Sequence, residues 1–320
     1  MTDELAVVAD IGGTNTRVAY ARGTQVQMHT VKRYRNADQA GIEPILRDFL
    51  SGSDARPHAV CVDMAGPVKD GVGQMTNLSW TIAADSIARE TGAKVVSVLN
   101  DMQAQGFAVA HLDHAAQRAI LPGRPADEGA TRLVVNVGTG LNASPVYRMG
   151  GQTVVPPAEA GHITMPVQTE EELRLKTWVA AQHGTPGLED VLSGRGFERI
   201  HAWLSAEAGD DSPALDASAI MKAFENGDPR ATHAAKLFVR FMGRYAGNLA
   251  LITLPFGGIY LVGGVVRHFG PHLLRLGFAE SFADKGRFGP YMTQFPVHLV
   301  EDDYAALTGC AGHLAERLAH

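Results

Sequence analysis

Short apolar runs alternate along the chain with longer segments in which apolar residues recur at helical spacing. Apolar runs typical of buried strands occur at 5–9, 59–64, 94–99, 133–135 and 259–262. Helical periodicity occurs at 83–90, 102–111, 170–182, 194–206, 217–225 and 232–253. Because strands alternate with helices, the pattern predicts an α/β fold whose second half is richer in helix.

Two stretches repeat the order strand, glycine loop, strand. The run at 5–9 leads into Asp10-Ile-Gly-Gly-Thr-Asn-Thr-Arg17, and the run at 133–135 leads into Asn136-Val-Gly-Thr-Gly-Leu-Asn142, which begins 126 positions later. Such a repeated order of elements predicts that the chain contains two diverged copies of one structural unit. A length of 320 residues is enough for two domains, and the pattern changes near Ala110.

Composition and charge exclude several classes of protein. Hydrophobic residues make up 45% and charged residues 19%, which is typical of a globular chain and not of a disordered one. The 28 Lys and Arg against 34 Asp and Glu give a net charge of −6, and no basic block is present. We therefore expect neither a nucleic-acid partner nor a membrane partner.

The cysteines and the N-terminal residues point to the cytoplasm. Cys61 and Cys310 lie far apart in apolar surroundings, so they predict neither a disulfide framework nor a zinc knuckle. The first residues are acidic and lack the basic region of a signal peptide. No apolar run approaches the ~20 residues needed to cross a bilayer. We expect a reduced, cytoplasmic protein.

Both glycine loops have the chemistry of a phosphate site. Gly12-Gly13-Thr14 and Gly138-Thr139-Gly140 combine glycines, which allow close approach of the backbone, with successive N–H donors and a hydroxyl. Two such loops could hold one polyphosphate. The alternative is that each loop is an ordinary tight turn.

Two other nucleotide motifs fit less well. Gly138-x-Gly140-x-x-Ala143 with Glu159 downstream satisfies the dinucleotide fingerprint, but that motif needs a helix after the loop. Pro145 and the strand-like residues around it predict a strand there, which leaves the pyrophosphate without a helix N-terminus. A Walker loop is excluded because the chain contains no Gly-Lys dipeptide.

Polar residues that follow apolar strands are the first candidates for chemistry. Asp10 could hold Mg²⁺ beside bound phosphates, directly or through water, or it could cap a turn. Asn100 and Asp101 follow the run at 94–99, at the carboxyl edge of the expected sheet. Asn100 could orient a hydroxyl-bearing substrate and Asp101 could accept its proton, although helix capping would explain either residue alone.

Glu159, His162 and Glu189 are weaker candidates, and each lies in a glycine-containing stretch. Glu159-x-x-His162 resembles half of a di-iron motif, but that design needs a second copy, which the chain lacks. Metal ligation by His162 is therefore not expected. Glu189, which follows Pro186-Gly187, could simply favour a helix N-terminus.

Taken together, these motifs resemble the bacterial glucokinases of the hexokinase and actin-like ATPase superfamily. The first loop resembles the family's first phosphate loop, and the second loop resembles its second. The other matching segments are Gly257-Gly-Ile-Tyr-Leu-Val-Gly-Gly-Val-Val266, Met75-Thr-Asn-Leu-Ser-Trp80, Leu192-Ser-Gly-Arg-Gly196 and Gly243-Arg-Tyr-Ala-Gly-Asn-Leu-Ala250. The resemblance spans nearly the whole chain in the family's order.

The resemblance implies a two-domain actin-like ATPase fold, also called ribonuclease H-like, with a cleft that closes on substrate. It implies a smaller domain at 1–110, on which a C-terminal helix at 302–320 packs, and a larger domain at 111–301. It further implies a cytoplasmic homodimer that phosphorylates the 6-hydroxyl of glucose with ATP and Mg²⁺ in the first step of glycolysis.

The resemblance also assigns roles to the candidate residues. Asp101 is implied as the catalytic base, and Asn100, Asp101, Glu159, His162 and Glu189 as glucose ligands, for which planar carboxylates are suited. The implied ATP-binding residues are Asp10, Gly12, Gly13, Thr14, Asn15, Gly138, Thr139, Gly140, Gly263 and Gly264, with Asp10 also on Mg²⁺.

Some residues depart from the family pattern. Asn142 and Ser144 follow the second loop where many relatives have another glycine. The related repressor, open reading frame and kinase family carries a zinc-binding cysteine cluster after its Glu-x-Gly-His motif, whereas here no cysteine follows His162 before Cys310. We therefore place the chain outside that family. A kinase for fructose or mannose and a non-catalytic sugar sensor remain alternatives.

Overall fold

The computed structural model describes residues 4–52, 56–75, 78–112 and 114–319. The chain forms two compact units. Unit 1 comprises Met1–Ala116, Val146–Pro157 and Asp302–His320, and unit 2 comprises Gln117–Pro145 and Ala158–Glu301. The segment Val146–Pro157 lies inside the range 111–301 expected for the larger domain, yet it groups with unit 1.

Unit 1 is built on a sheet with the strand order β3-β2-β1-β5-β9, and β4 also pairs with β2. Its strands are β1 (Leu5–Ile11), β2 (Asn15–Arg22), β3 (Gln25–Val26), β4 (Lys32–Arg35), β5 (Ala59–Met64) and β9 (Val95–Asn100). β1 runs antiparallel to β2 and parallel to β5, and β5 is parallel to β9. A small second sheet contains β6 (Val68–Lys69), β7 (Val72–Gln74) and β8 (Thr81–Ala83).

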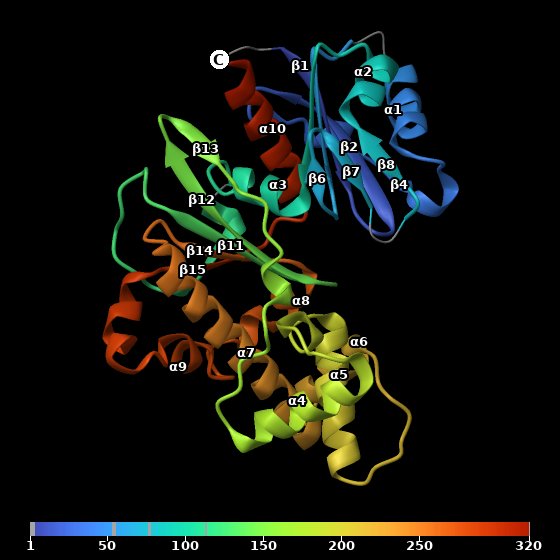
Figure 1. Cartoon of the computed structure of the whole chain (residues 1–320). Helices are drawn as coiled ribbons and strands as arrows, with labels where there is room; N and C mark the ends of the chain where they lie inside the picture. Colours follow the sequence, from blue (N-terminus) through green and yellow to red (C-terminus); the bar gives the residue numbers. More distant parts are fainter. Residues whose placement is uncertain (1–3, 53–55, 76–77, 113, 320) are drawn as a thin grey trace. The chain divides into compact units, whose positions relative to one another are not determined.

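Helices cover both faces of the unit 1 sheet. They are α1 (Ile42–Ser51), α2 (Ala84–Thr91), α3 (Asp101–Ala108) and α10 (Ala305–Leu318). Figure 1 shows α1 and α2 on one face and α3 and α10 on the other. All six residues of β5 are buried, which explains why its sequence, apart from Asp63, is apolar without alternation.

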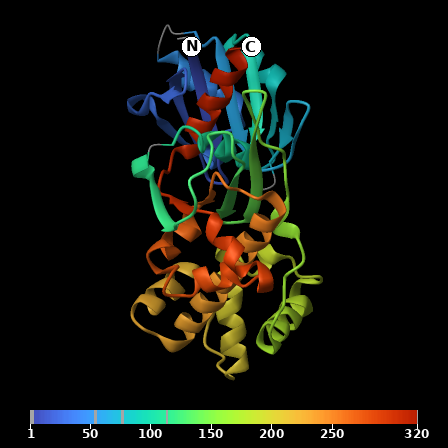
Figure 2. The ribbon, with the colours of Figure 1, turned by 90° about the vertical axis from the view of Figure 1, so that its left-hand side faces the viewer.

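The C-terminal helix α10 packs closely against α3 and lies beside β1, as Figure 2 also shows. The contact depends on Gly309. A Cβ atom at this position would lie only 1.8 Å from the carbonyl oxygen of Ala104 in α3. Only glycine therefore allows the two helix backbones to approach this closely.

A second large sheet has the strand order β10-β15-β14-β11-β12-β13, and its strands β10, β11, β14 and β15 lie in unit 2. Its strands are β10 (Gln117–Leu121), β11 (Arg132–Val137), β12 (Leu141–Met149), β13 (Gln152–Val154), β14 (Ile259–Val262) and β15 (Val297–Val300). β11, β14 and β15 are parallel neighbours. The order β12-β11-β14-β15 matches β2-β1-β5-β9 of unit 1, with a glycine loop after β1 and after β11. This match supports the predicted duplication.

Most of the helix in the chain belongs to unit 2, as the sequence pattern predicts. The helices are α4 (Glu170–His183), α5 (Gly194–Glu207), α6 (Ala217–Glu225), α7 (Pro229–Thr253), α8 (Gly264–Phe269) and α9 (Phe278–Ala283). Short 3₁₀ turns in the two units are Met28–Thr30, Asn36–Asp38, His114–Ala116, Ala160–His162, Leu188–Asp190, Gly270–His272 and Gly286–Gln294.

A buried ion pair ties α4 to α7 inside unit 2. Arg244 donates two hydrogen bonds, of 2.9 and 3.2 Å, to the carboxylate of Glu172, which is fully buried. Burial alone would raise the pKa of Glu172, but the hydrogen bonds from Arg244 and from the backbone of Gln168 lower it below its usual value. Each charge therefore depends on its partner.

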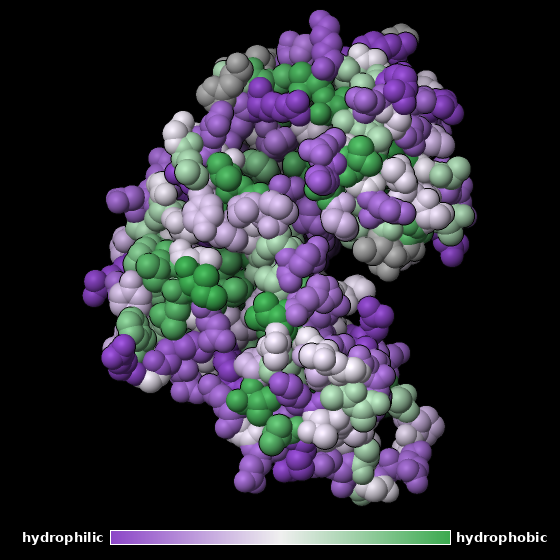
Figure 3. Space-filling view, in the orientation of Figure 1, coloured by the Kyte–Doolittle hydropathy of each residue, from purple (hydrophilic) through white to green (hydrophobic). Residues whose placement is uncertain are grey.

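The surface is mixed in character. Figure 3 shows hydrophilic residues over much of the visible face, with hydrophobic residues among them. Large exposed apolar side chains include Met149, Ile252 and Leu274, and exposure of this scattered kind is ordinary. Within the described ranges no helix combines the length and the apolar character that a membrane span requires.

Candidate active site

The first glycine loop joins β1 to β2 and is held by its own backbone and by Asn36. The N–H of Gly12 donates to the carbonyl oxygen of Asn15 at 3.0 Å. The buried side chain of Asn36 donates to the carbonyl oxygen of Gly12 and accepts from the hydroxyl of Thr16, both at 2.8 Å. Gly13 and Thr14 at the tip remain exposed. The loop is therefore fixed in shape and presents its tip to solvent.

Asp10 lies at the end of β1 and is mostly buried. One carboxylate oxygen accepts a hydrogen bond from Arg17 at 3.1 Å, and the side chain is 19% exposed. Burial raises the pKa of Asp10, although the Arg17 charge opposes this shift.

Asp63 is a further buried carboxyl group that we did not predict. It is the last residue but one of β5 and lies opposite Asp10 in the parallel register. The thiol of Cys310 contacts its Oδ2 atom at 3.4 Å, while Oδ1 has no hydrogen-bond partner among the described residues. Burial is the main cause that raises the pKa of Asp63 well above its usual range, and the Cys310 thiol, Asp10 and Asp101 add to it.

The donor set at this edge of the sheet is suitable for Mg²⁺. Mg²⁺ prefers oxygen ligands and is usually held by one or two carboxylates together with substrate phosphates. Asp10 and Asp63 supply two neighbouring carboxyl groups, and one oxygen of Asp63 is buried without a hydrogen-bond partner in the described part of the chain. No group of three or more His, Cys, Asp or Glu side chains forms a metal cage in the described part of the chain.

Asn100 and Asp101 mark the junction between β9 and α3. The Asn100 side chain caps the helix: its Oδ1 accepts from the N–H of Met102 and its Nδ2 donates to the carbonyl oxygen of Gly66, both at 2.9 Å. Gln103 completes a capping box by accepting from the Asn100 N–H at 3.1 Å. Capping thus accounts for much of what Asn100 does. It also fixes the position of Asp101 at the first residue of the helix.

The second glycine loop joins β11 to β12. The N–H of Gly138 donates to the carbonyl oxygen of Gly140 at 2.9 Å, and the N–H of Gly194 donates to that of Gly138 at 3.0 Å. Because a strand and not a helix follows the loop, the structure confirms that the dinucleotide fingerprint is a chance match.

Glu189 lies directly against this second loop. Its Oε2 atom accepts from the N–H of Leu141 at 2.8 Å. A Cβ atom on Gly140 would lie 2.9 Å from the same oxygen. Glu189 thus belongs to the second loop of unit 2 although 48 residues of sequence separate it from Leu141.

Glu159 and His162 are exposed residues of one short segment in unit 2. Asn142 holds that segment beside the second loop: its Nδ2 donates to Ala158 and its Oδ1 accepts from the N–H of Ala160 at 2.9 Å. Asn142, which stands where many relatives have a glycine, therefore has a structural role in this chain. A bridge between Thr164 and Gly187 brings the Glu189 segment alongside.

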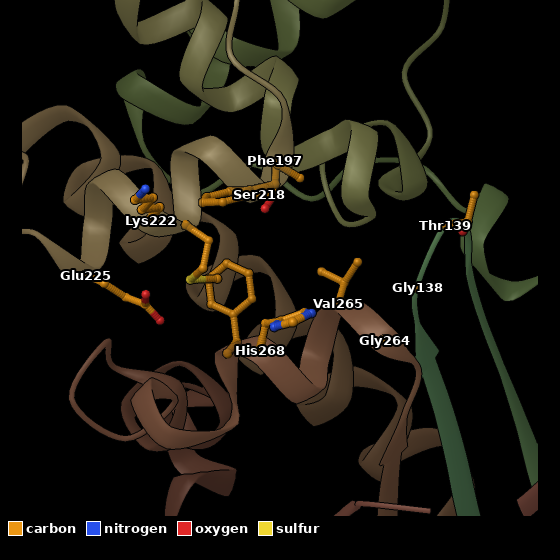
Figure 4. A pocket seen from close by; sticks show the side chains of 12 residues that line it. Gly138, Thr139, Phe197, Ser218, Lys222, Glu225, Gly264, Val265 and His268 are labelled. Carbon is orange, nitrogen blue, oxygen red and sulfur yellow. The ribbon is translucent and has the colours of Figure 1, made fainter. Parts of the chain in front are cut away.

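Gly263 and Gly264 pack against the second loop. Gly263 has a positive φ of 109°, and a Cβ atom there would lie 2.4 Å from the Asn136 side chain. Glycine is therefore required. Gly264 lines a pocket of about 690 Å³ together with Gly138 and Thr139, and Figure 4 shows these three residues at one side of it. Two of the predicted nucleotide-binding segments, the second glycine loop and the Gly263-Gly264 pair, therefore lie next to each other.

Five polar or sulfur-containing pocket residues were not predicted from the sequence: His268 in α8 and four residues of α6. Ser218, Met221, Lys222 and Glu225 come from one face of α6. Their spacing of three or four residues was the available signal, but nothing in the sequence connects α6 to the loop at Gly138.

Two α/β units of matching strand order, each with a glycine loop after the first strand of its sheet, define a protein of the two-domain actin-like ATPase fold. A family model described as Glucokinase matches residues 7–317. The chain belongs to the glucokinase family, which confirms the resemblance. Thr76 and Asn77 of the matching segment that begins at Met75 lie outside the described residues.

Known proteins of the family cover almost the whole chain. A glucokinase from Cupriavidus metallidurans is 33% identical over 98% of this chain and 94% of its own. The crystal structure of a glucokinase from an Antarctic psychrotroph has a TM-score of 0.87 at 29% identity, covering 97% of this chain and 98% of its own. A likeness in fold extends to a glucokinase of the repressor, open reading frame and kinase (ROK) family from Streptomyces griseus, in complex with glucose and AMPPNP. It has a TM-score of 0.66 at 19% identity, covering 98% of this chain and 99% of its own.

Proposed function

We propose that this protein is a glucokinase, which transfers the γ-phosphoryl group of ATP to the 6-hydroxyl of glucose and releases glucose 6-phosphate and ADP. The main observation behind the proposal is that both glycine loops, in a member of the glucokinase family, are held in shape by backbone hydrogen bonds. The Cupriavidus relative, named glucokinase, and the Streptomyces neighbour, whose structure holds glucose and an ATP analogue, support the choice of substrates.

ATP would bind through backbone amides and one carboxylate. The proposed ligands are Asp10, Gly12, Gly13, Thr14, Asn15, Gly138, Thr139, Gly140, Gly263 and Gly264. Exposed loop tips such as Gly13 and Thr139 can direct N–H groups at phosphate oxygens. Asp10 would hold Mg²⁺, directly or through water, and bound Mg²⁺ neutralises negative charge on the phosphates.

Glucose would bind through Asn100, Asp101, Glu159, His162 and Glu189. Asp101 is the proposed base, because its carboxylate can take the proton of the 6-hydroxyl as that oxygen attacks the γ-phosphorus. The new O6–phosphorus bond forms while the bond from phosphorus to the β,γ-bridging oxygen breaks, and ADP leaves with that electron pair. The helix cap made by Asn100 would hold Asp101 in place for this step.

Asp101→Asn tests the proposal, since an amide of the same size cannot accept the proton. We expect kcat to fall by ~10² or more, with glucose binding retained in titration calorimetry. Asp85→Asn is the matched control, because Asp85 is an exposed residue in the first turn of α2. Unchanged turnover in Asp101→Asn would remove Asp101 from the mechanism.

A panel of sugars addresses the alternatives. Glucose should have the highest kcat/KM, and a higher value for fructose or mannose would reassign the substrate. Failure to form ADP with any hexose would favour a sugar sensor. The family resemblance also leads us to propose a cytoplasmic homodimer, which light scattering on the purified protein can test.

A further inference from the structure

The pocket beside the second glycine loop has two chemically different sides. Figure 4 shows Gly138, Thr139 and Gly264 at one side and Lys222 and Glu225 at the other. The first side has the backbone amides of the proposed phosphate site. A nucleotide whose phosphates lie at Gly138 and Thr139 would direct its base toward the helix α6.

The space between the two sides is lined in part by apolar side chains. Its walls include the apolar side chains of Met221 and Val265. A volume of about 690 Å³ is within the usual range for small-molecule pockets. Apolar walls with a few polar groups at one end are the usual arrangement by which a site binds and orients a base.

Lys222 and Glu225 offer opposite hydrogen-bonding groups. An ammonium group only donates, and a carboxylate only accepts. Lys222 makes no ion pair within the described part of the chain. Glu225 is 56% exposed and lies 4.0 Å from the Nε2 atom of His272, whose pKa is lowered by burial and by Arg275. Because Glu225 is largely exposed and Lys222 has no ion-pair partner among the described residues, both polar groups are available to a ligand.

We propose that Lys222 and Glu225 are the specificity-determining residues for the nucleobase, and that they select a 6-aminopurine over a 6-oxopurine. The inference rests on the proposed kinase function. The carboxylate of Glu225 accepts a hydrogen bond from the exocyclic 6-amino group, and the ammonium of Lys222 donates to the adjacent ring nitrogen. A 6-oxopurine presents an acceptor to Glu225 and an N–H donor to Lys222, so both contacts become repulsive.

Glu225→Gln tests the inference with ATP and ITP, which differ at the 6-position and in protonation of the neighbouring nitrogen. Glutamine can donate to a 6-oxo group as well as accept. We expect the ratio of kcat/KM for ATP to that for ITP to fall by about tenfold in Glu225→Gln. Lys222→Gln should lower the same ratio. Glu128→Gln, at an exposed carboxylate outside the pocket, should leave it unchanged.

Equilibrium binding of ADP and IDP to the same proteins separates this inference from the proposed function. A wild-type protein without kinase activity on any nucleotide would refute the proposed function alone, because binding still reports base selection. An ADP-to-IDP affinity ratio that is the same in wild type, Glu225→Gln and Lys222→Gln would overturn the inference. Circular dichroism on each variant confirms that it is folded.

Discussion

His313 on α10 is a histidine whose burial predicts a specific loss of stability in acid. Its Nε2 atom lies 3.0 Å from the hydroxyl of Ser97 in β9, and its ring packs edge-on against Phe107 of α3 at 4.7 Å between centroids. Burial, followed by the positive charge of Arg317, lowers the pKa of His313 to about 4 from 6.5.

The size of the effect follows from proton linkage. The unfolded chain binds a proton at His313 near pH 6.5, whereas the folded chain binds it only near pH 4. The unfolded state therefore binds more protons between these values, and stability is lost as the pH falls through this window. The full shift corresponds to about 3 kcal/mol, of which about 2 kcal/mol is lost between pH 7.5 and pH 5.

His313→Gln removes this titration while retaining an amide that can bond Ser97. Urea unfolding of wild type and variant at pH 7.5 and pH 5 gives the free energy of unfolding of each. The wild type should lose about 2 kcal/mol more than the variant between the two pH values. His29→Gln, at an exposed histidine of unit 1, should behave as wild type. An equal pH dependence in wild type and His313→Gln would refute the reasoning.

Two further predictions concern packing and buried charge. Gly309→Ala should destabilise unit 1 by about 2 kcal/mol or more, because the new methyl group meets the Ala104 carbonyl. Calorimetry should show a lower Tm for this variant, whereas Gly52→Ala, with open space around the new methyl group, should change the Tm little. An unchanged Tm for Gly309→Ala would contradict the close packing of α10 on α3. Glu172→Leu should cost about 3 kcal/mol in urea unfolding because it leaves Arg244 buried without its partner. The double variant with Arg244→Met should recover most of this loss, and a purely additive double variant would argue against the pairing.

Several elements of the fold follow from local sequence alone. The runs at 59–64 and 259–262 and the periodic segment at 217–225 coincide with β5, β14 and α6. These elements are short and strongly patterned, so the local signal is sufficient. The helix at Ile42–Ser51 was not predicted although its buried residues follow helical spacing. The strand β15 was missed because His298 interrupts its short apolar run.

The candidate site was only partly visible in the sequence. Asp10 and Asp101 stand out because each follows an apolar strand. Asp63 lies within the apolar run of β5, and its pairing with Asp10 arises only from the parallel register of β1 and β5. Asn36 and Asn142 hold the loop segments through side-chain bonds that no motif records.

The sequence by itself determined several of the strands, the two glycine loops and the types of chemical group near them, because these depend on neighbouring residues along the chain. Tertiary structure decided which distant groups meet. The packing of α6 places Lys222 and Glu225 in the pocket of the second loop, and the burial of His313 sets the pKa of its ring. Proximity and desolvation depend on how the whole unit packs, so no local pattern can encode them.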